Sequence, residues 1–194
     1  MKPMNSKPLF IAALLAVLSS APLSAAVPSL VLQTEPRTIL VGDVFSVDVV
    51  ARNLFAGAYA NDQLLAFGFD VDWAPSGLID LASHTLYPLF EDHSEALGLD
   101  LAASAFPGLT AADVIGDVRL ATLQFRALAQ GSAWLAVNTN STDPNQGLIF
   151  LDQAAVQGLN ASLNITAVPL PPAALLFASA ACLIRRGKRG KDLA

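Results

Sequence analysis

The sequence has very little cysteine: Cys182 is the single one in 194 residues. It lies in an apolar run near the C-terminus, so no disulfide can form within the chain and any exported domain must be stabilised by packing. Histidine is scarce too, with only His84 and His93. They stand nine residues apart, which fits no helical or hairpin pair of zinc ligands. The chain therefore carries no zinc-binding pattern.

Basic residues are rare between the two ends of the chain. Of the 11 lysines and arginines, two lie in the first seven residues and five lie after Ile184. The stretch between has no lysine, four arginines and 15 of the 16 carboxylates, a net charge of −11. Such a body repels nucleic acid, which we exclude as a partner. It is compatible with Ca²⁺, neutral sugars or a basic protein, or the carboxylates serve solubility alone.

The motifs of common enzyme classes are missing as well. There is no Gly-x-Ser-x-Gly elbow and no glycine loop for phosphate. The segment Glu91-Asp92-His93 with Glu95 has the residue types of a metal or acid–base site, but it is also typical of a solvated loop. No pair of carboxylates stands out for glycoside cleavage. The sequence therefore predicts a protein that is not an enzyme.

The N-terminus has the three parts of a secretory signal peptide. Residues 1–7 are basic, Leu9–Leu18 is apolar, and 19–26 is rich in small residues, with Ser24 and Ala26 suited to signal peptidase. We predict that residues 1–26 are a signal peptide cleaved after Ala26. This predicts export through the inner membrane.

The C-terminus also has three parts. A short motif is followed by an apolar run at 173–184 and a basic tail at 185–191 that contains Arg185, Arg186, Lys188 and Arg189. The motif is Val168, Pro169, Leu170, Pro171 and Pro172. As a helix the 15 apolar residues from Leu170 reach only about 22 Å, short of a hydrocarbon core of about 30 Å. The basic residues then mark the cytoplasmic side.

This order resembles the PEP-CTERM class of bacterial sorting signals, in the variant that reads Val-Pro-Leu-Pro-Ala. Pro172 stands here where the usual alanine would be. The resemblance implies processing by an exosortase, a membrane-embedded cysteine protease or transpeptidase, after transient residence in the inner membrane. It implies a location at the cell surface or in the extracellular matrix of a Gram-negative bacterium. A simple tail anchor and a buried terminal helix are the alternatives.

The body between these signals, residues 27–167, is predicted to be one β-rich domain. Residues 44–51 and 64–73 alternate apolar and polar side chains, as in half-buried strands. Further strands are expected at 30–32, 38–41, 118–127, 132–139, 148–151 and 161–167. We expect 118–127 and 132–139 to form a hairpin and Thr110–Asp113 to begin a short helix. Strands without βαβ alternation predict two packed antiparallel sheets, an all-β sandwich.

Three segments carry a second resemblance. They are Val41–Val49, Phe67–Pro75 with Leu78, and Leu120–Ala127 before Gly131. Their order resembles cohesin domains, over roughly residues 29–167. This implies a jelly-roll sandwich of about nine strands with one short helix, related in fold to carbohydrate-binding modules. It implies binding of an extracellular protein, such as a dockerin-like module whose calcium lies on the dockerin side.

Calcium is the one cofactor that the residues themselves suggest. Asp70 and Asp72 lie two apart on one strand, so their carboxylates project to the same side and are candidate metal ligands. Turn and loop chemistry is the alternative. Trp73 shares its face with Phe67 and is expected in the core. An exposed Trp134 or Tyr59 would favour carbohydrate binding, with exopolysaccharide as the ligand.

Overall fold

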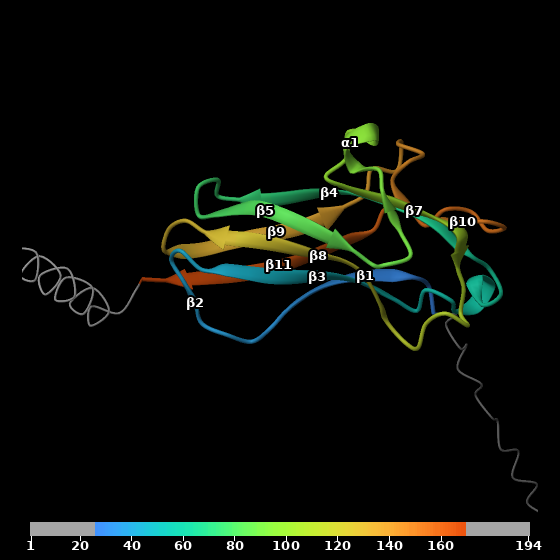
Figure 1. Ribbon diagram of the computed structural model, residues 1–194, viewed down its shortest axis with the longest axis horizontal. Helices are drawn as coiled ribbons and strands as arrows, with labels where there is room; N and C mark the ends of the chain where they lie inside the picture. Colours follow the sequence, from blue (N-terminus) through green and yellow to red (C-terminus); the bar gives the residue numbers. More distant parts are fainter. Residues whose placement is uncertain (1–25, 170–194) are drawn as a thin grey trace, which may run out of the picture.

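The computed structural model describes residues 26–169. Residues 1–25 of the predicted signal peptide and the sorting signal from Leu170 onward lie outside the described residues. Two sheets pack face to face over one hydrophobic core (Figure 1). Within the described range, no helix has the length and apolar character needed to cross a membrane.

One sheet has four strands in the order β1-β3-β8-β5. Its strands are β1 (Ser29–Thr34), β3 (Val44–Arg52), β8 (Val118–Ala127) and β5 (Ile79–Leu86). The other sheet has seven strands, in the order β2-β11-β9-β4-β7-β6, with β10 paired to β4. Its strands are β2 (Ile39–Leu40), β11 (Asn160–Val168), β9 (Gly131–Asn138), β4 (Leu64–Ala74), β7 (Leu101–Leu109), β6 (Glu91–Asp92) and β10 (Gly147–Phe150). The prediction of an antiparallel sandwich is confirmed, and nine of the eleven strands have four or more residues.

The core follows from the alternation that the sequence predicts. Inward positions of β3 and β4 are buried, and the largest fully buried side chains include Phe45, Phe67, Phe69 and Phe125. Phe45 stacks on Phe125, with ring centroids 5.9 Å apart. In β3 the alternation is broken after Val49 by a bulge, which buries Val50 beside it.

The predicted hairpin of residues 118–127 and 132–139 is wrong. Strand β8 pairs with β3 and β5, whereas β9 pairs with β11 and β4, so the chain crosses from one sheet to the other at Gln130-Gly131. The crossing is held by the N–H of Leu128, which donates to the carbonyl of Leu78 over 2.8 Å. A short polar turn can join two paired strands of one sheet, or it can lead from one sheet to the other. The sequence pattern is the same in both cases, so it did not distinguish a hairpin from a connection between the sheets.

The predicted helix at Thr110–Asp113 is also wrong. The carboxylate of Asp113 accepts hydrogen bonds from the backbone and the hydroxyl of Thr110, over 2.8 and 2.6 Å, and the segment is an isolated turn. The short helix α1 is Ser94–Leu97, and a single 3-10 turn, η1, is Gly57–Tyr59. Strand β7 had no signal in the sequence, because its alanines are buried on both faces and do not alternate with polar residues.

Glycine at position 68 allows a loop to lie on the outer face of β4. A Cβ at Gly68 would lie 2.1 Å from the carbonyl oxygen of Asn145 and 3.0 Å from the side chain of Leu99. The loop between β9 and β10 therefore lies directly on the strand backbone here. The outer face of the seven-stranded sheet is thus covered at this end of β4.

This contact predicts that Gly68→Ala destabilises the domain by about 3 kcal/mol, because the added methyl group must displace backbone. Gly77→Ala is the matched control: Gly77 has φ +92° with open space around it, so only backbone strain of about 1 kcal/mol is expected. Both values are measured by denaturant unfolding of residues 26–169. Equal destabilisation by the two substitutions would contradict the close packing of the loop.

Candidate functional site

The outer face of the seven-stranded sheet is open where β4, β9 and β11 run side by side. Along these strands the register places Asp72 beside Ala136 and Ser162, and Ala74 beside Trp134 and Asn164. All of these outward side chains except Ala136 are exposed. We call this open area the β4–β9–β11 face; its outward residues are Asp72, Ala74, Ser132, Trp134, Asn138, Asn160, Ser162, Asn164 and Thr166.

The polar side chains of this face form hydrogen bonds across the strands. The amide of Asn138 donates to the carboxylate of Asp72 over 2.9 Å and accepts from the amide of Asn160. The hydroxyls of Ser132 and Thr166 are 3.0 Å apart. These short polar groups keep their remaining donors and acceptors toward solvent, so a partner that binds the face is offered a flat array of hydrogen-bonding groups.

The two predicted calcium ligands project to the same side of β4, as expected, but each has its own amide partner. Asp70 accepts from Gln146 over 2.8 Å, and Asp72 accepts from Asn138. Among the described residues, no three His, Cys, Asp or Glu side chains are grouped so that they could hold a metal ion. The calcium site at Asp70 and Asp72 stays a prediction.

The two tryptophans lie on opposite faces of the seven-stranded sheet. Trp73 is half-buried and packs edge-on against Phe125, with centroids 5.8 Å apart, which confirms the predicted core position. Trp134 is 42% exposed in the middle of the β4–β9–β11 face. Tyr59 packs on Phe150 with centroids 4.5 Å apart and is half-buried. Trp134 is therefore the tryptophan of the described residues that a partner can reach.

The positive charges of the described residues are gathered on the opposite side of the sandwich. Arg52 and Arg119 belong to β3 and β8 and pair with Asp117 at 3.2 Å and Asp48 at 3.8 Å. Arg126 is also on β8, and Arg37 donates to a carbonyl of β3. A polar groove of about 530 Å³ crosses this sheet beside the segment that joins β1 to β2. None of the strands of the seven-stranded sheet carries a lysine or an arginine.

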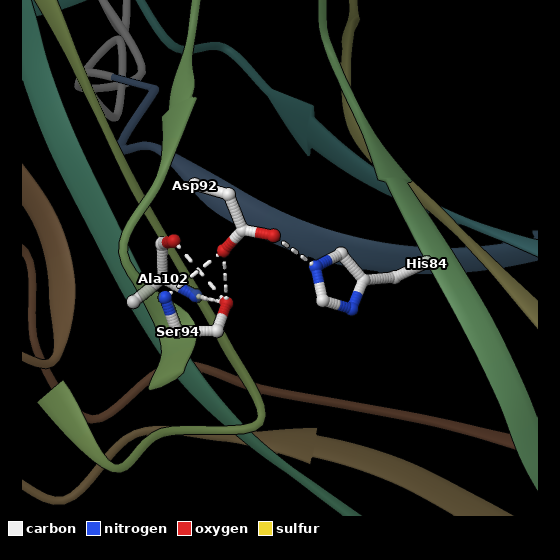
Figure 2. A network of polar contacts seen from close by, with 4 residues as sticks. All are labelled: His84, Asp92, Ser94 and Ala102. Atoms are coloured by element: carbon white, nitrogen blue, oxygen red, sulfur yellow. Dashed lines mark hydrogen bonds and ion pairs between the residues drawn. The ribbon is translucent and has the colours of Figure 1, made fainter. Parts of the chain in front are cut away.

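A second polar cluster joins the two sheets at one edge (Figure 2). His84 of β5 approaches the carboxylate of Asp92 of β6, with Nε2 and Oδ2 2.7 Å apart. The other oxygen of Asp92 accepts from the hydroxyl of Ser94 over 2.7 Å and from its backbone N–H over 2.9 Å. Ser94 is buried, and its hydroxyl oxygen accepts the N–H of Ala102 over 2.9 Å. We call these four residues the edge clasp.

The edge clasp has the residue types of a catalytic triad in an order that does not activate the serine. A serine nucleophile needs a base beside its hydroxyl. Here the hydroxyl of Ser94 donates to the carboxylate, and the imidazole of His84 contacts the far oxygen of that carboxylate. His93, the other histidine, pairs with Ser104 at 2.8 Å. The clasp is therefore a structural link between the sheets. Within the Glu91–His93 segment, Asp92 and His93 have separate hydrogen-bond partners.

The charge state of Asp92 is set by these bonds. Partial burial raises the pKa of Asp92, but the hydrogen bonds from Ser94 and His84 outweigh it and lower the pKa to about 2. The pKa of Asp62, in the loop after η1, is lowered by hydrogen bonds in the same way. It is buried, which raises its pKa, yet backbone N–H groups of Gln63, Asp152 and Gln153 donate to it and hold the pKa below its usual value.

Sequence reasoning did not predict that Asn138, Asn160 and Asn164 lie together on the β4–β9–β11 face. The three strands lie far apart in the chain, and only the pairing of β9 with both β4 and β11 brings these residues together. The sequence did contain one signal: polar residues stand at alternate positions in 160–166, as on the exposed side of a strand. Trp134 points to the same side of the neighbouring strand β9.

The lowered pKa of Asp92 predicts how the clasp responds to pH. Its stabilising contribution is complete above the ordinary pKa of 3.8 and is lost as the pH falls to about 2. We therefore expect Asp92→Asn to lower the Tm at pH 7 and the difference from the wild type to vanish toward pH 2. Glu91→Gln, an exposed neighbour, serves as control. A difference in Tm that is the same at pH 7 and pH 2 would contradict the assignment.

Comparison with known proteins gives the fold. No protein-family model matches the sequence, and a search of curated proteins found no relative. Among solved structures, a cohesin module from a family 33 glycoside hydrolase of Clostridium perfringens aligns with a TM-score of 0.56 and 10% identity, over 74% of this chain and 98% of that module.

Two further solved structures align less well. A non-cellulosomal cohesin from Archaeoglobus fulgidus has a TM-score of 0.42 at 12% identity, over 74% of this chain and 92% of that one. A type I cohesin–dockerin complex from Clostridium thermocellum has a TM-score of 0.38 at 12% identity, over 74% of this chain and all of the matched one. Residues 26–169 of this chain have a cohesin-like fold.

Proposed function

We propose that this chain is a non-catalytic binding module that is exported and that binds an extracellular protein through the β4–β9–β11 face. The observation that carries the proposal is the cohesin-like sandwich itself, whose open β4–β9–β11 face presents Trp134 with 42% of its surface exposed. Tryptophan is enriched among the residues that dominate binding energy in protein interfaces. The hydrogen-bonding groups around it match the polar rim of such interfaces.

The charge of the module favours a partner with a neutral or basic contact surface. Asp72 lies on the face, and Asp70 lies beside it toward the loop that covers Gly68. The strands around them carry no positive side chain. An acidic partner would therefore be repelled. A dockerin-like module is the form of protein partner that the cohesin resemblance implies.

The two ends of the chain support a location outside the cytoplasm. The proposal includes export by the signal peptide at 1–26 and sorting by an exosortase through the motif at 168–172, the apolar run and the basic tail. Processing would leave the module at the cell surface or in the extracellular matrix of a Gram-negative bacterium. The sequence order of these parts is the support for this half of the proposal.

Carbohydrate binding is the second candidate function, and the exposure of Trp134 is the feature that was expected to favour it. Trp134 and the amides of Asn138, Asn160 and Asn164 together resemble a platform on which a sugar ring can stack and form hydrogen bonds. The negative charge of the module then favours a neutral exopolysaccharide over an acidic one.

The proposal predicts that Trp134→Ala weakens binding about tenfold or more, because truncating a central tryptophan costs at least about 1.4 kcal/mol. Residues 26–169 are immobilised and exposed to the secreted proteins and the exopolysaccharide of the producing cells. Phe106→Ala is the matched control, since Phe106 is an exposed aromatic residue on β7.

Capture of one protein that is lost with Trp134→Ala and kept with Phe106→Ala supports the proposal. Retention on polysaccharide alone supports the second candidate, and capture that survives Trp134→Ala contradicts the placement of the site. A parallel series with EDTA tests calcium: loss of binding would support a metal at the contact, and unchanged binding would argue against one.

A further inference from the structure

Three segments of the chain read Asn-x-Ser/Thr, the sequon in which asparagine accepts N-linked sugars in secreted proteins. They begin at Asn140, Asn160 and Asn164, and all three asparagines are exposed. Asn160 and Asn164 lie on β11, whereas Asn140 lies in the loop between β9 and β10. The sequence alone treats the three as equal, but the structure does not.

The amide of Asn140 is held in a turn by the third residue of its own sequon. The hydroxyl of Thr142 donates to Oδ1 of Asn140 over 2.8 Å, and the backbone N–H of Thr142 donates to the same oxygen over 3.0 Å. Both bonds use the oxygen of the amide, and neither uses Nδ2. The backbone N–H of Asn140 donates to the side chain of the buried Gln146, which fixes the start of the turn.

This arrangement favours bond formation at the amide nitrogen of Asn140. An amide nitrogen is a weak nucleophile because its lone pair is delocalised onto the carbonyl group. When Nδ2 gives up a proton, negative charge collects on Oδ1, and donors already directed at that oxygen stabilise the charge, as in an oxyanion hole. The turn therefore prepares Nδ2 of Asn140 for attack on a sugar.

The other two sequons have different contacts, because they lie on a paired strand. Nδ2 of Asn160 donates to the side-chain oxygen of Asn138 on β9. In the sequon of Asn164, the hydroxyl of Thr166 is 3.0 Å from the hydroxyl of Ser132. The nucleophilic atom of one sequon and the hydroxyl of the other are thus engaged across the strands.

We propose that Asn140 is a glycosylation site of the folded domain, whereas Asn160 and Asn164 stay unmodified. The donor is a sugar linked to a diphosphate. A bond forms between Nδ2 and the anomeric carbon of the sugar, and the C–O bond to the diphosphate breaks. The diphosphate leaves with the electron pair, and the proton of Nδ2 passes to a base of the transferase.

Modification at this position goes beyond the proposed binding function and is compatible with it. Asn140 follows the end of β9, and Asn138, the last residue of that strand, is about 13 Å along the strand from Trp134. A sugar on Asn164 would instead lie beside Trp134, its partner in the register of β9 and β11. A sugar on Asn140 alone therefore stands at the end of the β4–β9–β11 face and leaves the tryptophan accessible.

The test is peptide mapping by mass spectrometry of the full chain, isolated from the producing cells and their medium. We expect the peptide with Asn140 to be heavier by the mass of one or more sugar residues, and Asn160 and Asn164 to be unmodified. An unmodified Asn140, or a sugar on Asn160 or Asn164, overturns the proposal. The same digest shows whether the chain begins at Val27, so a failure of the proposed export is read separately.

Substitutions within the turn separate the sequon geometry from simple exposure. Thr142→Ala removes the hydroxyl donor and Asn140→Gln displaces the amide, so we expect both to abolish the added mass. Ser141→Ala is the matched control, because Ser141 is an exposed hydroxyl at the middle position, and we expect it to keep the sugar. A circular dichroism spectrum checks that the variants fold. An added mass that persists with Asn140→Gln or Thr142→Ala, or that is lost with Ser141→Ala, would contradict attachment at Nδ2 of Asn140.

Discussion

The contact between Phe125 of β8 and Trp73 of β4 joins the two sheets, and the rest of the sandwich depends on packing of this kind. The rings meet edge to face at 5.8 Å, and Phe125 also stacks on Phe45 within its own sheet. Fully burying one such side chain contributes about 1.5–3 kcal/mol. Because the single cysteine lies in the C-terminal apolar run, no covalent link assists this packing. The inward side chains of the strands therefore form the core that stabilises the domain, and only the outward faces can contact a partner.

The outward faces differ from one another. Three arginines of the described residues lie on the four-stranded sheet, and two of them are paired with carboxylates. The seven-stranded sheet is covered at one end, where the loop at Asn145 lies on Gly68, and open at the other, around Trp134. Its open part carries short polar side chains that are held in register by the strands. The open part of the seven-stranded sheet is thus an accessible surface with Trp134 at its centre.

The proposed binding face and the proposed sorting signal are adjacent in the chain. Strand β11 ends at Val168, the first residue of the proposed sorting motif, where it pairs with β2, and the carboxylate of Asp43 closes the turn after β2. A short connection then follows before the apolar run. The proposed face includes β11, the last strand before the predicted sorting signal.

The sandwich could be predicted because apolar and polar residues alternate in β3 and β4. Such a period of two residues is typical of strands that bury one side and expose the other, and not of helices. The sequence located β11 for the same reason. It misplaced the connection after β8, since a short polar turn does not reveal whether the next strand joins the same sheet. It missed β7, whose alanines are buried on both faces. The candidate site depends on the pairing of three distant strands, and alternation within one strand carries no information about its neighbours.

The central claim is that the face around Trp134 contacts the partner. Oxidative footprinting of residues 26–169, alone and saturated with a protein that they capture, tests this directly. We expect the oxidation of Trp134 to fall sharply in the complex, while the oxidation of the exposed Phe106 is unchanged. Unchanged oxidation of Trp134 in the saturated complex would contradict it.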